Sequence, residues 1–250
     1  MKTVLLAFLL LSYYPAADAQ ITKTATRIIQ PFVAKGCKAL SLKTLMRLYQ
    51  TSKLVKGTKI LGKELGKMRL TALQRSSVYS WIAVTDGKIA EEEARTMFKS
   101  IGKIEGFAKT MRKITGANAN VAKGHLTELR QAHHLKEIGF TLSEIGQVFK
   151  DPLKKGMTDI DLTFFRGLKK FAMEVKDYQP GAFPLDTIRK DADTLLEFCK
   201  ASKCQPFFTF SVSPANFPEI IRELDKRGIK YLIGSPQDQA TQIMAMTDLE

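Results

Sequence analysis

Two short segments in the C-terminal half carry acidic residues in an otherwise apolar setting. Asp159 and Asp161 lie in the segment TDIDLTFF, and Glu174 and Lys176 lie in the segment MEVK. Residues two apart on a strand point to the same face, so all four polar groups are expected to meet on one side of a sheet. Carboxylates that are brought together repel one another unless a cation lies between them, and Mg²⁺ prefers such oxygen ligands. The pattern predicts a divalent-cation site with an ammonium group beside it.

Such a site is suited to hydrolysis of a phosphodiester. A bound cation polarises the phosphate and lowers the pKa of its water. Lys176 lies two residues from a predicted ligand, where its ammonium could orient the attacking water or stabilise the charge of the transition state. The competing interpretation is that Lys176 only pairs with Glu174 or Asp161 on a solvated sheet face, without catalysis.

The elements that must position these residues can be predicted from apolar periodicity. Spacing of three and four residues indicates helices, alternation indicates strands, and Gly167 lies where a hairpin would turn. The expected order is a helix over 123–138, strands over 145–149, 158–165 and 170–177, a helix over 185–200, a strand over 205–212, a helix over 214–227 and a strand over 230–233. This order predicts an α/β domain with a central mixed sheet and helices on its faces.

The acidic segments resemble the signature of a known enzyme family. Asp161, twelve further residues and then Glu174-Val175-Lys176 are similar to the D-(x)n-(D/E)-x-K signature of PD-(D/E)XK nucleases. TDIDL and MEVK resemble the E-I-D-L and V-E-V-K segments of the branch that contains Holliday-junction resolvases and many restriction enzymes. That family has a restriction-endonuclease-like α-β-β-β-α-β core, and the resemblance covers residues 125–235. No proline precedes the aspartate here, as is common among members.

The resemblance implies a role for each matching residue. It implies that Asp161, Glu174 and Lys176 are catalytic, and that Asp161 and Glu174 bind Mg²⁺ or Mn²⁺. It also implies that a glutamate of the first helix, Glu128, completes the metal site. Three accessory residues are expected, namely Asp159, Gln179 and His125. The implied activity is that of a Mg-dependent endonuclease, with DNA a more natural substrate than RNA.

The first residues have the pattern of a secretory signal peptide over 1–19. Lys2 precedes an apolar run that ends at Leu11, and Ala17-Asp18-Ala19 provides small residues before a cleavage point near Ala19. This run is shorter than the roughly 20 residues of a spanning helix, and the mature chain is expected to contain no transmembrane segment. Secretion into the periplasm or the extracellular medium is therefore predicted. In an exported chain Cys199 and Cys204 could form a disulfide and leave Cys37 free, or all three cysteines could stay reduced. The spacing leaves both states open.

Positive charge is concentrated in the N-terminal half. The chain has a net charge of +14, and residues 20–127 hold 21 Lys and Arg against 6 acids. We expect a basic all-α region over 20–116, a linker over 117–124, the α/β domain over 125–235 and a C-terminal tail over 236–250. The Lys-rich surface of 20–127 could clamp a phosphate backbone, bind an anionic membrane, or simply be solvated.

Together these features predict a secreted metal-dependent nuclease. Export suggests a toxin aimed at competing cells, which would require an immunity protein that covers the acidic site, or a scavenger of nucleic acid. The alternative is an exported basic protein that binds nucleic acid or membrane and has a catalytically inactive nuclease-like fold. The sequence leaves the oligomeric state open.

Overall fold

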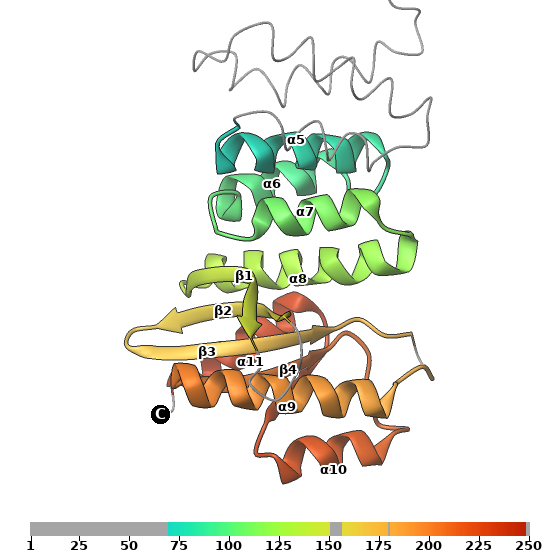
Figure 1. Ribbon diagram of the computed structural model, residues 1–250, viewed down its shortest axis with the longest axis vertical. Coiled ribbons are helices and arrows are strands. Elements are labelled where there is room, and N and C mark those ends of the chain that lie inside the picture. Colours follow the sequence, from blue (N-terminus) through green and yellow to red (C-terminus); the bar gives the residue numbers. More distant parts are fainter. Residues whose placement is uncertain (1–69, 151–156, 180, 249–250) are drawn as a thin grey trace, which may run out of the picture.

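The protein is an α/β structure in which a five-stranded sheet lies between two layers of helices (Figure 1). The structure is a computed structural model, and it describes residues 70–150, 157–179 and 181–248. The predicted signal peptide, Cys37 and the basic residues 20–69 lie outside these ranges, so their predictions stay untested. Within the described ranges, none of the helices is both long and apolar enough to cross a membrane.

The sheet is mixed and its strands follow the order of the sequence. The strands are β1 Thr141–Lys150, β2 Met157–Arg166, β3 Lys169–Lys176, β4 Gln205–Phe210 and β5 Lys230–Ile233. β1, β2 and β3 pair antiparallel, whereas β3, β4 and β5 pair parallel. The β2–β3 hairpin turns at Gly167, as predicted, and its φ of 58° is one that glycine adopts without strain.

The helices lie before, between and after these strands. They are α5 Ala72–Thr85, α6 Glu91–Ile101, α7 Phe107–Gly116, α8 Ala119–Glu137, α9 Leu185–Ser202, α10 Pro218–Lys226 and α11 Pro236–Asp248. From α8 to β5 the order of helices and strands is the predicted one. The described part of the basic region, from α5 to α7, is helical as predicted.

Two segments that we expected to be irregular are helical. The predicted linker 117–124 is wrong from Ala119 onward, because the Asn118 side chain accepts a hydrogen bond from the Val121 N–H and so caps the start of α8. The predicted tail 236–250 contains α11, whose Ala240 and Ile243 are fully buried against the core. Burial of these side chains gives α11 a stabilising contact that its own sequence does not reveal.

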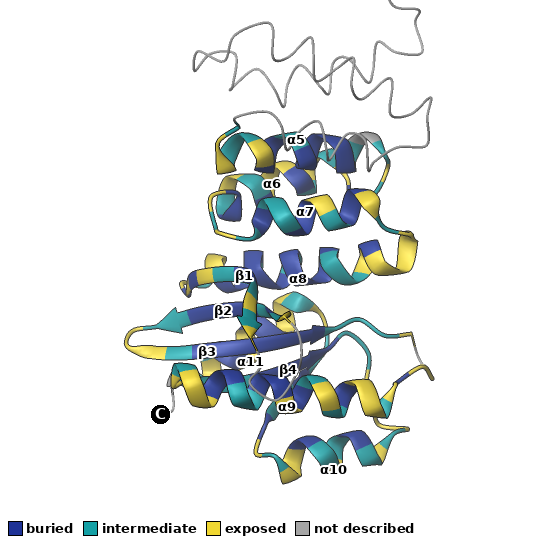
Figure 2. Cartoon of the chain, in the orientation of Figure 1, coloured by how far each residue is buried: buried dark blue, intermediate teal, exposed yellow. Residues whose placement is uncertain are grey.

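The core consists of two clusters, one on each face of the sheet. The larger cluster continues from α5, α6 and α7 through α8 and α11 to one face of the sheet, and α8 is buried on both of its sides (Figure 2). The smaller cluster packs the other face against α9 and α10. A single hydrophobic cluster joins the described helical region to the sheet, so these two described parts share one core.

A close backbone contact fixes α7 on the edge strand β1. A Cβ added to Gly106, which precedes α7 and has a φ of 88°, would lie 1.6 Å from the carbonyl oxygen of Ile145. The Ile145 N–H donates to the Glu105 carbonyl over 2.9 Å at the same place. This contact determines where the side chains of α7 lie over the sheet.

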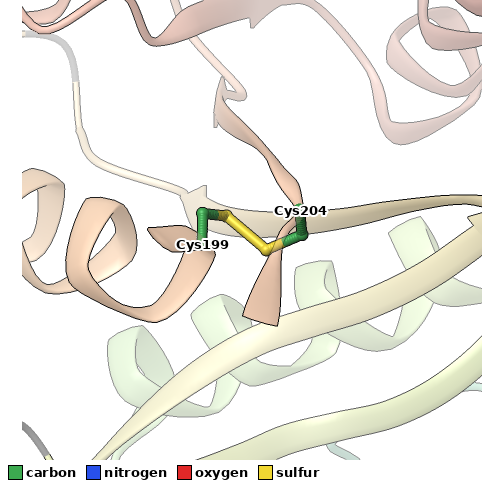
Figure 3. Close-up of a disulfide and its surroundings, with 2 residues drawn as sticks. All are labelled: Cys199 and Cys204. Atoms are coloured by element: carbon green, nitrogen blue, oxygen red, sulfur yellow. A yellow bond between two sulfur atoms is a disulfide. The ribbon is translucent and has the colours of Figure 1, made fainter. Parts of the chain in front are cut away.

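A disulfide joins the end of α9 to the segment before β4. It links Cys199 and Cys204, whose Cα atoms are 4.5 Å apart (Figure 3). Of the two states that the sequence left open for this pair, the structure contains the oxidised one.

Candidate active site

The sheet forks where its acidic residues lie. β2 and β3 pair from the hairpin as far as Leu162 and Met173, which form the last pair between them. Beyond that point β2 continues with β1 alone, and β3 continues with β4 as far as Lys176. Asp161 and Glu174 are the first residues past the last pair, so they lie at the point where the two strands separate.

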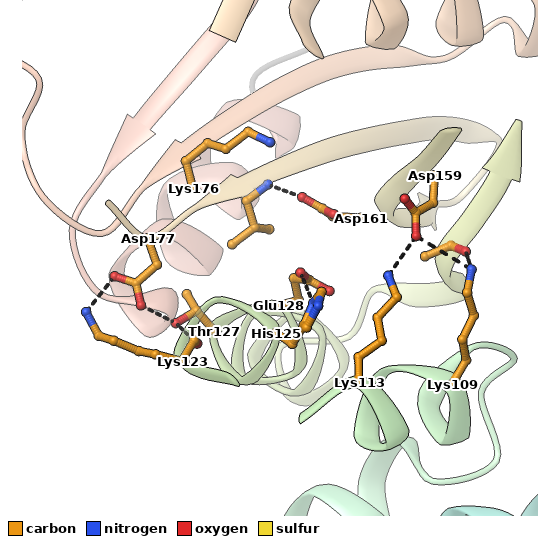
Figure 4. A network of polar contacts seen from close by, with 12 residues as sticks. Lys109, Lys113, Lys123, His125, Thr127, Glu128, Asp159, Asp161, Lys176 and Asp177 are labelled. Carbon is orange, nitrogen blue, oxygen red and sulfur yellow. Dashed lines mark hydrogen bonds and ion pairs between the residues drawn. The ribbon is translucent and has the colours of Figure 1, made fainter. Parts of the chain in front are cut away.

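The Asp161 side chain holds the two strands together at this point. The Val175 N–H of β3 donates to Asp161 Oδ2 over 2.8 Å, in place of a backbone acceptor on β2 (Figure 4). The charge of Glu174 acts on Asp161, so the two carboxyl groups lie near each other beside this contact.

Burial and nearby negative charge raise the pKa of both carboxyl groups. Glu174 is 4% exposed, and burial with the nearby charges of Glu174 and Glu128 raises the pKa of Asp161 well above its usual range. Burial also raises the pKa of Glu174, although the Lys176 ammonium opposes that rise. Removing carboxylates from water without enough positive charge favours their neutral forms. An added cation would reverse this preference.

Lys176 lies between two carboxylates. Its Nζ is 2.7 Å from Glu174 Oε2 and 2.9 Å from Asp191 Oδ2, on α9. Burial acts to lower the pKa of Lys176, but the surrounding carboxylates, with Glu174 the strongest, outweigh it and raise the pKa well above its usual value. The side chain is therefore a fixed ammonium at the fork.

The sequence prediction missed Asp191, although the pattern of α9 contains a signal. Ile188, Ala192 and Leu195 are fully buried and form the apolar stripe of this helix. Asp191 occupies the position in that stripe three residues after Ile188 and four before Leu195. An acidic side chain at such a position needs a partner on the neighbouring element, and Lys176 is that partner.

Glu128 faces the fork from α8, as expected for the glutamate of the first helix. It is 7% exposed, and its charge acts on Asp161. His125, one turn earlier, lies with Nδ1 2.7 Å from Glu128 Oε1. Gln179 instead lies exposed in the loop after β3, where its carbonyl accepts from the Ala182 N–H. Among the described contacts, its side chain has none with the fork carboxylates.

Asp159 lies apart from the other predicted site residues. Its Oδ2 is 2.8 Å from Lys113 Nζ and 3.6 Å from Lys109 Nζ, both on α7. Burial acts to raise the pKa of Asp159, but the Lys113 ammonium outweighs it, and the net pKa is lowered. The expectation that Asp159 converges with Asp161 and Glu174 is therefore wrong.

The physical reason is a change in the face that β2 presents. Ile160 packs into the cluster beneath the sheet with α9, whereas Leu162 packs into the cluster with α8. On a regular strand these two side chains would share a face. Gly146, which lies opposite Asp161 between paired residues of β1, has a φ of 65° and interrupts the regular strand there.

The residues at the fork suit a cation that needs few protein ligands. Among the described residues, no group of three or more His, Cys, Asp and Glu side chains is arranged to hold a metal ion. Mg²⁺, however, is usually bound through one or two carboxylates, with water and substrate phosphate completing its shell. Asp161 and Glu174 form such a pair, and burial raises the pKa of each, which a bound cation would counteract.

Comparison with known proteins gives a weak likeness to a solved structure. No family model matches the sequence, and no curated protein matches it significantly. The solved structure of Can2 from Sulfobacillus thermosulfidooxidans in complex with cyclic tetra-adenylate (cA4) is similar over 70% of this chain, with 13% sequence identity and a TM-score of 0.38. The chain covers 61% of that protein's length. A TM-score of this size does not establish a common fold, so the functional argument depends on the geometry of the fork.

Proposed function

We propose that the protein is an exported nuclease of the PD-(D/E)XK kind that uses Mg²⁺ or Mn²⁺ to hydrolyse phosphodiester bonds, with DNA as its preferred substrate. The observation that carries this proposal is the meeting of Asp161, Glu174 and Lys176 where β2 and β3 separate. The succession α8-β1-β2-β3-α9-β4 supports it, because the acidic signature lies on the second and third strands of that order.

Each residue of the fork has a part in this proposal. Asp161 and Glu174 bind the cation, and Glu128 assists from α8. The bound cation supplies a polarised phosphate and a water of lowered pKa. Lys176 holds an ammonium beside the cation site, where it offsets the negative charge that develops on the phosphate oxygens.

The balance of charge at the fork favours a cation as ligand. The charges of Glu174 and Glu128 act on Asp161, and that of Asp191 acts on Glu174. The ammonium groups of Lys176 and Lys113 offset part of this negative charge. A divalent ion would supply positive charge to the Asp161–Glu174 pair, whose pKa values are raised by burial. A scissile phosphate drawn to that ion would arrive beside an ammonium that is already fixed in place.

Export and a toxin role form the less direct part of the proposal. The signal-peptide pattern over 1–19 supports secretion, and the Cys199–Cys204 disulfide is a bond that persists in oxidising compartments. A nuclease exported from its producer would act on foreign or environmental nucleic acid. If it is a toxin, an immunity protein that covers the acidic fork would protect the producer.

A second candidate function is nucleic-acid binding without catalysis. The observation that favours it is that Lys176 already pairs with both Glu174 and Asp191, an arrangement that is complete without a metal ion. In that case the fork would be a structural ion-pair network, and the basic surface alone would carry the function. Turnover is the property that separates the two candidates.

Cleavage of supercoiled plasmid DNA tests the proposal. Purified protein is incubated with plasmid in Mg²⁺, Mn²⁺ or EDTA, beside the variants Glu174→Gln and Lys176→Gln. We expect nicking with either metal, none in EDTA, and a loss of about 10²- to 10³-fold in both variants. Lys136→Gln, which removes a lysine from the opposite end of α8, is the matched control and keeps its activity.

Two results would reject the proposal. Cleavage that continues unchanged in Glu174→Gln and Lys176→Gln would place the activity elsewhere. Binding of plasmid without cleavage under every metal condition would favour the inactive binding protein. Parallel reactions with a folded RNA and with single-stranded DNA establish which nucleic acid is preferred.

A further inference from the structure

Two lysines of α7 contact Asp159 on β2, two residues before the fork residue Asp161. Lys109 and Lys113 are four residues apart, so they occupy the same face of the helix one turn apart. Lys109 Nζ also donates to the Gly146 carbonyl over 3.0 Å, and that contact holds the side chain against β1. The docking of Gly106 on Ile145 sets the position of the whole helix. The two ammonium groups are therefore placed by the fold at this edge of the sheet.

Both ammonium groups converge on a single carboxylate. Asp159 Oδ2 is within 4 Å of each lysine, at 2.8 Å from Lys113 Nζ and 3.6 Å from Lys109 Nζ (Figure 4). In these direct contacts, two ammonium groups therefore share one carboxylate. The charge of Lys113 also acts on Glu128 and Asp161, so this lysine lies between the α7 face and the fork.

We infer that Lys109 and Lys113 form a binding site for the phosphate backbone of the nucleic acid, and that Asp159 occupies this site in the free protein. We call Lys109, Lys113 and Asp159 the α7 rim. The inference rests on the proposed function for its class of ligand, a phosphodiester chain that enters the fork. It gives Asp159 the role of an internal competitor in place of the accessory role expected for it at the metal site.

The exposure of the three side chains supports an exchangeable contact. The side chains of Lys109, Lys113 and Asp159 are 35%, 32% and 39% exposed. Ion pairs with this much contact with water contribute little to stability, so an incoming phosphate can displace the carboxylate at little cost. By contrast, the Lys176 side chain is 12% exposed and stays with its carboxylates.

A carboxylate and a phosphate are alike in the feature that matters here. Each presents anionic oxygen atoms that accept hydrogen bonds from an ammonium. The two lysines lie one helical turn apart, which lets them contact either two oxygens of one phosphate or two phosphates in succession. Contacts of this kind give affinity that falls with salt and carries no sequence information.

Binding measured without catalysis tests the inference. Fluorescence anisotropy of a labelled 20-base-pair DNA duplex is followed in EDTA, over a series of salt concentrations, for the wild type and three variants. Asp159→Asn is expected to bind about two- to fivefold more tightly, because it releases both lysines. Lys113→Gln is expected to bind about eightfold more weakly at 0.1 M salt, and to lower the slope of log K against log salt by about 0.9.

A matched control keeps the test specific. Lys136→Gln removes one lysine from the opposite end of α8, and its affinity and salt slope should equal those of the wild type. Thermal unfolding of each variant shows whether it is folded. The triple variant Lys109→Gln/Lys113→Gln/Asp159→Asn should not show the increase in DNA affinity expected for Asp159→Asn alone, because it has no rim lysine left to release.

The outcomes separate this inference from the proposed function. If Asp159→Asn binds less tightly than the wild type, or if Lys113→Gln leaves the salt slope unchanged, the α7 rim does not contact phosphate. Undetectable binding of the wild-type protein at low salt would also overturn the inference. If the rim variants behave as expected but the protein never cleaves DNA, the binding site stands and the proposed nuclease activity fails.

Discussion

The fork and the α7 rim are built from the same two kinds of side chain, in opposite proportions. At the fork, the carboxyl groups of Asp161, Glu174 and Asp191 surround one ammonium, that of Lys176. At the rim, two ammonium groups surround the single carboxylate of Asp159. The excess charge is negative in one place and positive in the other, although both lie along the same strand β2.

Burial increases the contrast between the two places. Glu174 is 4% exposed, and burial raises its pKa although the Lys176 ammonium opposes the rise, so its carboxylate at the fork is poorly solvated. Asp159 is 39% exposed at its side chain, and its pKa is lowered by Lys113, so the rim is already satisfied. The comparison suggests that the fork selects a cation whereas the rim selects an anion. A phosphodiester with its metal ion supplies both.

The largest expected effect comes from Asp161, and it tests whether this side chain acts through its charge or only through its hydrogen bond to β3. Asp161→Asn keeps an oxygen that accepts from the Val175 N–H but removes the charge beside Glu174. We expect cleavage to fall about 10²- to 10³-fold while the free energy of unfolding stays equal or rises, because a repulsive neighbour has gone. Nicking rates and urea denaturation measure the two quantities. A fall in stability that accounts for the lost activity would show that the Asp161 carboxylate is structural.

The next prediction displaces the rim and leaves the fork in place. In Gly106→Ala the new Cβ would collide with the Ile145 carbonyl, and the positive φ adds strain, so a loss of about 3 kcal/mol in unfolding free energy is expected. Gly116→Ala is the control, because a Cβ at Gly116 meets nothing within 4 Å. Urea denaturation should show the control to be as stable as the wild type or slightly more so. Equal stabilities for the two variants would contradict the close contact between α7 and β1.

A smaller effect concerns the support behind the fork. The Cys199–Cys204 disulfide ends the helix that supplies Asp191, and it closes a loop with a sequence separation of 5. Loop-closure entropy gives a loss of about 2 kcal/mol when the bond is removed. Urea denaturation with and without reductant measures it, and Cys199→Ala/Cys204→Ala should match the reduced wild type and no longer respond to reductant. An unchanged midpoint in reductant would show that the bond contributes nothing.

The smallest predicted effect concerns how Lys176 is held. Asp191→Asn removes one of its two carboxylate partners, and we expect kcat to fall about tenfold with KM nearly unchanged, while Asp191→Glu recovers part of the loss. Asp193→Asn, on the same helix but paired with Arg227 at 2.8 Å, is the matched control and should keep full activity. If Asp191→Asn and Asp193→Asn have equal kcat, Lys176 does not depend on Asp191 for its position.

Local sequence determined most of the fold. Alternating apolar residues predicted the strands on either side of Gly167, and apolar residues at helical spacing predicted α8 and α9. The spacing of apolar residues is informative because it reflects which face of a segment is buried. The same alternation placed Asp161 and Glu174 on neighbouring strands. A hairpin with a short turn leaves few other registers, so these two carboxyls could be paired from the sequence alone.

Tertiary structure alone decided which side chains share a partner. Asp159 and Lys113 are 46 residues apart in the chain, and only the docking of α7 on β1 brings them together. β2 is separate from β3 in the residues before Leu162, and this separation puts Asp159 and Asp161 in different surroundings. It depends on how each strand pairs with its outer neighbour. Asp191 meets Lys176 because α9 packs beneath the sheet. Such contacts follow from the packing of whole elements, and the period of a single segment holds no information about them.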